Sequence, residues 1–346
     1  MKTYFLNINN ILKIQINNHN PKYKNIFLNI FKHYENFVTE KLDECDLIIN
    51  LNKINVNKDN LTYQNNKIFI SEDYLGVINE EYKHAKWSFE LHHLEQTPTI
   101  LNIDYSILGA IFITGDVIDF VIQYKLQQKD SILIHASSVY KETRSITFPS
   151  RGGGGKTTMA MKFVNIGFKL LGDNYILLNR TQTESYPTSL SLFSYNLTEA
   201  IKQQLTTQEK IRLVFNQAIY TISFGYAKFF LKVNPLKLGE IGKNSSLQNI
   251  YVLIPSMKAD TLRVEPMDRA DLVNYMVNNQ KLEFPLFNEY LDIFSYFNPR
   301  SGLSNFWVNY QKILESNLEQ RNQYNVVFIG KQKYDALFNQ IRDTPA

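Results

Sequence analysis

The chain has 346 residues, 44% of them hydrophobic, and a net charge of +4 at pH 7. This length suits one large domain or two of ordinary size, and the apolar fraction is normal for a globular core. The 37 basic and 33 acidic residues are spread along the chain, so nucleic acid is not the default partner. Cys45 is the only cysteine, which excludes an intramolecular disulfide and a cysteine-built metal site and favours a reducing cytoplasm.

The sequence shows neither an export signal nor a clear membrane span. Residues 1–5 lead into an asparagine-rich segment instead of a long apolar core with a cleavage site. The most apolar window, residues 107–122, is interrupted by Asp116 and Asp119 and is too short to cross a bilayer comfortably. We therefore expect a buried helix there, and no membrane partner.

Residues 1–100 have the pattern of a small α+β region. Short runs of alternating apolar residues at 4–8, 47–51 and 67–70 predict strands, and a helix is expected near residues 24–40. No catalytic pattern occurs in this part of the chain.

The next elements lead to a glycine-rich loop. Helical spacing covers residues 106–126, and residues 131–139 are expected to form one buried strand. A second strand, residues 145–148, follows the turn at 141–144, so an antiparallel pair is predicted.

The stretch that follows, residues 148–158, has the character of a phosphate cradle. Its candidate nucleotide-binding residues are Ser150, Arg151, Gly152, Gly153, Gly154, Gly155, Lys156, Thr157 and Thr158. Successive glycines can turn several N–H groups onto one centre, and the N-terminus of the next helix adds partial positive charge. In this type of loop, Lys156 reaches the outer phosphates and the Thr157 hydroxyl ligates Mg²⁺. The strict pattern has glycine where this chain has Ser150. A surface loop without function is the alternative, and the order of strand, loop and helix disfavours it.

An acidic residue follows the next strand. The helix after the loop covers residues 157–166 and stops at Gly167, and the strand at 168–172 leads into Asp173. A carboxylate at that position can lie beside the phosphate loop. Farther on, the pattern predicts strands at 249–255 and 325–329, a helix at 268–278 and a C-terminal helix near 334–341.

Three segments together resemble a known family. Residues 133–137, the glycine loop and residues 167–174 look like the catalytic domain of HPr kinase/phosphorylase and its shorter HPr-kinase-like relatives, such as those of lasso-peptide maturation. The resemblance is strongest over residues 130–180, continues weakly through residues 186–187 and 249–255 to the end of the sequence, and does not reach residues 1–100. It implies a P-loop (Walker A) fold of the α/β (α+β) class, related to phosphoenolpyruvate carboxykinase. The expected domains are 1–100, assigned to acceptor recognition, and 101–346, the catalytic domain.

The family's functional residues carry over at a few positions. His135 matches its strand histidine, Lys156 and Thr157 its P-loop pair, and Asp173 the first of two consecutive aspartates; Asn174 replaces the second. An amide cannot accept a proton and is a poorer Mg²⁺ ligand than a carboxylate. If catalysis needs only the first acid, Asp173 is the general base; if it needs the second, the protein is a weakened or inactive kinase.

The sequence thus leads to two hypotheses. The first is a cytoplasmic kinase, using ATP and Mg²⁺, that transfers the γ-phosphate to a hydroxyl of a peptide, protein or small molecule. Here Asp173, His135 and Lys156 are catalytic, and Thr157 and Asp173 hold the metal. The second, motivated by Ser150 and Asn174, is a nucleotide-binding interaction protein that transfers nothing. The resemblance also allows a homo-oligomer.

Overall fold

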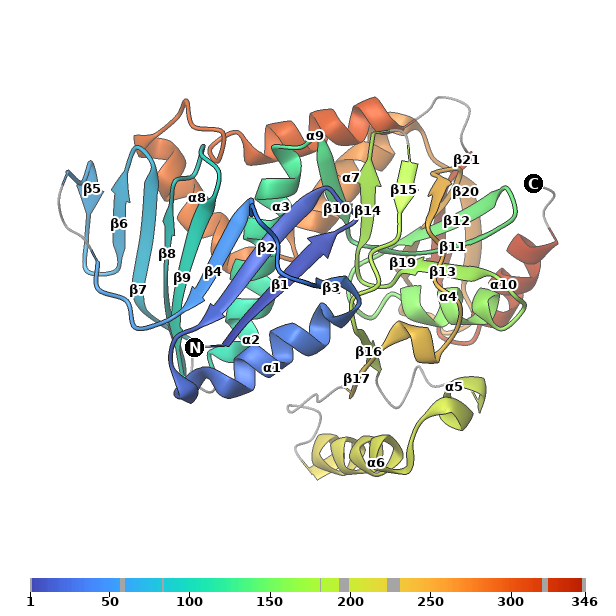
Figure 1. The fold of residues 1–346 in the computed structure, drawn as a ribbon. Helices are drawn as coiled ribbons and strands as arrows, with labels where there is room; N and C mark the ends of the chain where they lie inside the picture. Colours follow the sequence, from blue (N-terminus) through green and yellow to red (C-terminus); the bar gives the residue numbers. More distant parts are fainter. Residues whose placement is uncertain are drawn as a thin grey trace. The chain divides into compact units, whose positions relative to one another are not determined.

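The computed structural model describes residues 2–56, 60–82, 84–106, 108–180, 182–192, 199–222, 231–318 and 323–343. The chain has a mixed α and β architecture and divides into two compact units (Figure 1). The first unit contains residues 1–132 and 280–314, and the second contains 133–279 and 315–346. These ranges differ from the expected boundary at residue 100. Strand β9 (Thr99–Tyr105) spans that position and pairs along its length within one sheet.

The first unit is built on one large sheet. Within the described residues, nine strands follow the order β3-β1-β2-β4-β9-β8-β7-β6-β5. The pairs β2–β4 and β4–β9 are parallel, whereas the remaining neighbouring pairs of this sheet are antiparallel. Besides β9, the strands are β1 (Lys2–Ile8), β2 (Leu12–Asn18), β3 (Val38–Thr39), β4 (Leu47–Leu51), β5 (Tyr63–Gln64), β6 (Ile68–Ser71), β7 (Tyr74–Tyr82) and β8 (Ala85–His92).

Alternation along these strands creates one apolar face. In β4, Leu47, Ile49 and Leu51 are buried while the residues between them are only half-buried, as the period of two predicts. Aromatic rings from two helices pack on this side of the sheet: Phe120 stacks on Phe287 with centroids 3.7 Å apart, and Phe287 lies 5.7 Å from Phe89 of β8. The helices of this unit are α1 (Lys24–His33), α2 (Ala110–Phe112), a π-helix (Ile113–Ile118), α3 (Asp119–Gln127), α8 (Pro285–Phe297) and α9 (Phe306–Asn317).

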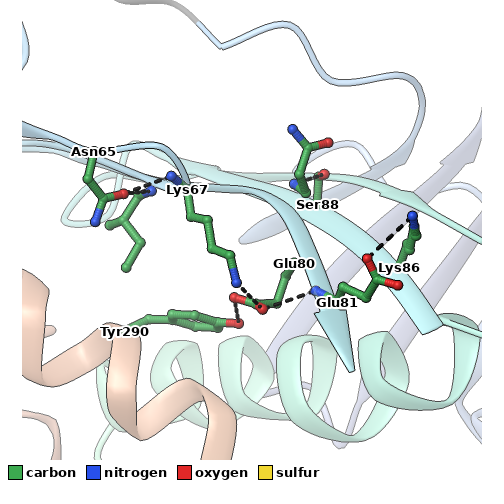
Figure 2. Close-up of polar contacts among 9 residues, drawn as sticks. Asn65, Lys67, Glu80, Glu81, Lys86, Ser88 and Tyr290 are labelled. Atoms are coloured by element: carbon green, nitrogen blue, oxygen red, sulfur yellow. Dashed lines mark hydrogen bonds and ion pairs between the residues drawn. The ribbon is translucent and has the colours of Figure 1, made fainter. Parts of the chain in front are cut away.

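A polar cluster ties α8 to β7 where that strand is irregular. The register of β7 against β8 shifts between Val77 and Glu80. Glu80 receives a hydrogen bond of 3.2 Å from the Tyr290 hydroxyl and an ion pair of 2.9 Å from Lys67 (Figure 2). Burial and the neighbouring Glu80 carboxylate raise the pKa of Tyr290, so its hydroxyl stays a proton donor.

The second unit contains the glycine-rich loop. Its main sheet has the order β13-β11-β12-β19-β21-β20, in which β12–β19 and β19–β21 are parallel. The strands are β11 (Ala136–Lys141), β12 (Arg144–Pro149), β13 (Lys169–Gly172), β19 (Asn249–Pro255), β20 (Leu262–Pro266) and β21 (Gln323–Ile329). A second sheet joins β10 (Ser131–Ile134), β14 (Ile176–Asn179), β15 (Gln182–Glu184) and β18 (Asn244–Ser246), and β16 (Leu190–Leu192) pairs with β17 (Leu231–Val233). The helices are α4 (Lys156–Val164), α5 (Glu199–Gln204), α6 (Thr207–Ile222), α7 (Arg269–Lys281) and α10 (Tyr334–Arg342).

The strands at the beginning of this unit confirm one sequence prediction and contradict another. The antiparallel pair is confirmed, because β11 runs against β12 with Ser137 opposite Phe148. The single strand expected over residues 131–139 is wrong, because the strand is interrupted at His135 and its two halves, β10 and β11, join different sheets. An apolar run shows that a segment is buried but not where it changes sheets.

Candidate functional site

The glycine loop connects β12 to α4 in the second unit. Gly153 and Gly155 have φ angles of 84° and 85°, in the left-handed region that glycine adopts without steric cost. Gly155 is the residue immediately before α4, so the loop turns into the first turn of the helix. Unpaired N–H groups at such a turn favour a bound anion.

Tyr334, the first residue of α10, packs on this loop. A Cβ atom at Gly155 would collide with the Tyr334 ring, and the Tyr334 hydroxyl lies 3.3 Å from the carbonyl oxygen of Gly154. Two features therefore favour glycine at position 155: its positive φ angle, and the Tyr334 ring, which leaves no room for a side chain. The loop pattern alone gave no indication of Tyr334, which lies about 180 residues away in the sequence.

Lys156 is buried at the base of the loop. Its Nζ lies 2.8 Å from Nε2 of His135 and donates a hydrogen bond of 2.7 Å to the carbonyl oxygen of Ser150. An ammonium group has only donors, so a charged Lys156 requires Nε2 of His135 to act as the acceptor in this contact. The structure therefore brings His135 to the lysine that follows the glycine loop.

Thr157 and Asp173 also meet. The Thr157 hydroxyl lies 3.0 and 2.9 Å from the two oxygens of the Asp173 carboxylate, and the Ser137 hydroxyl donates to Asp173 Oδ1. Asp173 is only 5% exposed. Because Ser138 pairs with Gly172 across β11 and β13, the next residues, Ser137 and Asp173, come opposite each other.

Ser150 and Asn174 depart from the family pattern, and both have a local structural explanation. Ser150 is fully buried, and its hydroxyl donates a hydrogen bond of 2.6 Å to the carbonyl oxygen of Leu253; its backbone lacks the positive φ that would require glycine. Asn174 is exposed in the bend between β13 and β14 with φ of 78°, a conformation that asparagine tolerates better than most residues.

The remaining loop residues lie farther from these contacts. Arg151, Gly152 and Gly153 are exposed, whereas Thr158, in the first turn of α4, is half-buried.

Two further residues surround His135. The side-chain amide of Asn279 donates a hydrogen bond of 3.1 Å to the His135 carbonyl oxygen, and the centroid of the Tyr175 ring lies 5.7 Å from that of the imidazole. Sequence patterns did not single out Ser137, Tyr334 or Asn279. Of these, only Ser137 lay within a segment that carried the family resemblance.

The donor set of this site is compatible with Mg²⁺ only when phosphate is present. In the described part of the chain, no group of three or more His, Cys, Asp or Glu side chains is arranged to hold a metal. Mg²⁺ in phosphoryl-transfer sites takes a loop hydroxyl and one carboxylate from the protein, and phosphate oxygens and water supply its remaining ligands. Thr157 and Asp173, already in contact, would be that pair.

Comparisons with known proteins give no family assignment. No protein-family model matches the chain, and a search of curated proteins finds no significant match. Among the described helices, none is both long and apolar enough to span a bilayer.

Proposed function

We propose that this protein is a kinase that transfers the γ-phosphate of ATP to a hydroxyl group, on a P-loop fold of the HPr-kinase-like type. One observation carries the proposal: beside a glycine loop that enters a helix, a buried lysine lies together with a Thr–Asp pair whose carboxylate is buried. Each of these groups matches a requirement of phosphoryl transfer, which depends mainly on positioning and charge stabilisation.

In this proposal the chain's own groups have separate tasks. The loop N–H groups and Lys156 bind the β- and γ-phosphates, and Lys156 leaves the Ser150 carbonyl to do so. His135 orients the lysine from the other side through its Nε2 contact. Ser137 fixes one oxygen of Asp173, which leaves the carboxylate in a defined position to accept the proton of the attacking hydroxyl. When bound through Thr157 and Asp173, Mg²⁺ would neutralise charge on the phosphates.

The phosphate-binding role is tested by Lys156→Ala. Loss of a desolvated charge at the outer phosphates should weaken ATP binding by about 1.5–3 kcal/mol, or roughly 10- to 150-fold in dissociation constant. Isothermal titration with ATP and Mg²⁺ measures this effect. Lys162→Ala is the matched control, because Lys162 lies on the same helix and pairs with Asp335. An unchanged dissociation constant for ATP in Lys156→Ala would refute the proposed phosphate-binding role of the loop.

The general-base role is tested by Asp173→Asn. This change keeps the shape of the side chain but removes its proton-accepting ability, so ATP should still bind while transfer falls by roughly 10²–10⁴. Transfer is followed with radiolabelled ATP on a panel of serine-containing peptides and small alcohols. Equal rates for the native protein and Asp173→Asn would show that the base has been assigned wrongly.

The second candidate function is nucleotide binding without transfer. Asn174 favours it, because the amide lies where the family has a second carboxylate. Asn174→Asp restores that acid at an exposed bend whose positive φ aspartate also tolerates. In an active kinase this substitution should change the rate only modestly. If neither form transfers phosphate to any acceptor tested, yet both bind ATP, the non-catalytic function is favoured.

A further inference from the structure

Helix α6 (Thr207–Ile222) has most of its apolar residues on its solvent-exposed side. Ile211, Val214, Phe215 and Ile222 are 64%, 71%, 63% and 77% exposed, and Ala218 between them is also exposed. At 100° per residue, these five positions fall within an arc of about 100° on one side of the helix. We call this face the α6 stripe (Figure 1 shows α6 near β16 and β17).

The opposite side of α6 attaches the helix to the second unit. Leu213 is buried in the same apolar cluster as Leu231 of β17. Glu209, on the same side, forms an ion pair of 2.8 Å with Lys237. The helix is thus attached through its more polar side. An ordinary surface helix packs its apolar side against the core and exposes its polar side. A contiguous exposed apolar stripe of this kind marks an interaction surface.

The spacing of the stripe is that of a helix that packs against another helix. Ile211, Phe215, Ala218 and Ile222 are separated by four, three and four residues, which is the alternation of coiled-coil core positions. The flanking cations Lys210 and Arg212 lie near the N-terminal end of α6, and α6 has no acidic side chain besides the paired Glu209. An antiparallel neighbour would bring the negative end of its own helix dipole close to these cations.

The register of the stripe is complementary to itself. If two copies of α6 pair antiparallel about an axis between residues 216 and 217, Ile211 meets Ile222 of the second copy. Phe215 then meets Ala218, a large side chain against a small one, and each contact occurs twice, as a two-fold interface requires. Complete burial of the exposed stripe in both copies would remove on the order of 1,000 Å² from solvent, which is at the lower limit for a specific interface.

We propose that the α6 stripe is a homodimer interface in which two copies of this chain pair their α6 helices antiparallel. A membrane surface suits the stripe less well. Helices that lie on membranes carry many cations on the polar face, and in α6 that face is occupied by the contacts of Leu213 and Glu209. The proposal does not depend on the phosphoryl-transfer activity.

The first test measures association of the purified full chain by sedimentation over a range of concentrations. The native protein should dimerise reversibly, and Phe215→Glu should raise the dimer dissociation constant roughly 30-fold or more, as for a central interface residue. Met257→Glu is the control, because Met257 is a fully exposed apolar residue of the same unit outside α6. A native protein that stays monomeric at all concentrations, or a dimer that Phe215→Glu does not weaken, would overturn the proposal.

The second test determines orientation by disulfide trapping in a Cys45→Ser background, since Cys45 is the only native cysteine. Chains with Ile211→Cys and chains with Ile222→Cys should cross-link when mixed and not when either is oxidised alone. Cross-linking within either single variant would indicate a parallel pair and overturn the antiparallel register. In a flotation assay with phosphatidylcholine–phosphatidylserine vesicles, Phe215-dependent binding of a monomer would assign the stripe to membranes instead.

Discussion

Tyr334 connects the glycine loop to the C-terminal helix through both its ring and its hydroxyl. The ring fills the space where a side chain at residue 155 would lie, and the hydroxyl contact of 3.3 Å is long for a hydrogen bond. The ring is therefore the more important part of this contact for the shape of the loop.

We expect Tyr334→Ala to weaken ATP binding about 5- to 20-fold, because the loop loses the packing that fixes its conformation. Tyr334→Phe keeps the ring and should bind ATP within about twofold of the native protein. Isothermal titration measures both variants, and circular dichroism checks that α10 is retained. Equal losses in the two variants would show that the hydroxyl, and not the ring, supports the loop.

For single residues, the sequence predicted site residues in and near the glycine motif but none that are distant from it in the chain. The motif and the family resemblance together identified Lys156, Thr157, Asp173 and His135, and the structure places them in two contacting pairs. Tyr334 could not be found in this way, because its contact with Gly155 depends on how α10 packs against α4 and no local pattern encodes that packing.

Among the elements, the π-helix at Ile113–Ile118 contains an unusual acid. Burial, and then the negative charge of Glu283, raise the pKa of Asp116 to about 7 from its ordinary value of 3.8. Between those two pH values the folded protein holds a proton that the unfolded chain has released. The free energy of unfolding therefore falls as the pH rises from about 4 to about 7.

Asp116→Asn should remove this pH dependence. We expect the substitution to raise the free energy of unfolding by about 1–3 kcal/mol at pH 8 and to have little effect at about pH 3, where Asp116 is mostly protonated in both the folded and the unfolded state. Thermal unfolding followed by circular dichroism at the two pH values tests this. Asp43→Asn, at an exposed acid of the same unit, serves as control. The same shift at both pH values would show that ionisation of Asp116 is not the cause.

The sequence predicted most elements around the loop because their apolar periodicity is strong. The strands at 249–255 and 325–329 and the helix at 334–341 are present as β19, β21 and α10, with small differences at their ends. The interruption at His135 was missed. Its cause is tertiary, since Ala136 begins a new pairing with β12, and a continuous apolar run carries no information about such a change of sheet.

On the scale of the whole molecule, the two units are not consecutive in the sequence. The chain leaves the first unit after residue 132, returns at 280 and leaves it again after 314. Composition and charge do not reveal such an arrangement, because the linkers that mark consecutive domains are missing from a unit built of two segments. The expected boundary at residue 100 followed the end of the family resemblance and fell inside β9.

Removal of residues 1–100 should therefore prevent folding of the first unit. It would delete β1–β8 and uncover the rings of Phe120 and Phe287, which pack near Phe89 of β8. We expect an insoluble protein, or one that binds the dye ANS strongly. A soluble product with native-like circular dichroism and no dye binding would contradict this prediction, and it would make the proposed acceptor-binding role of residues 1–100 directly testable by deletion.

The division into two units also determines what the protein's fluorescence can report. Its two tryptophans are Trp87, buried in β8, and Trp307, whose indole N–H donates a hydrogen bond of 3.0 Å to the side-chain oxygen of Asn288. Both tryptophans lie in the first unit. Indole emission therefore comes from residues of that unit alone, whereas the unit with the glycine loop carries only tyrosine as a strong intrinsic fluorophore. If ATP binds at the glycine loop, a change in tryptophan emission would show, without any label, that its binding affects residues of the first unit.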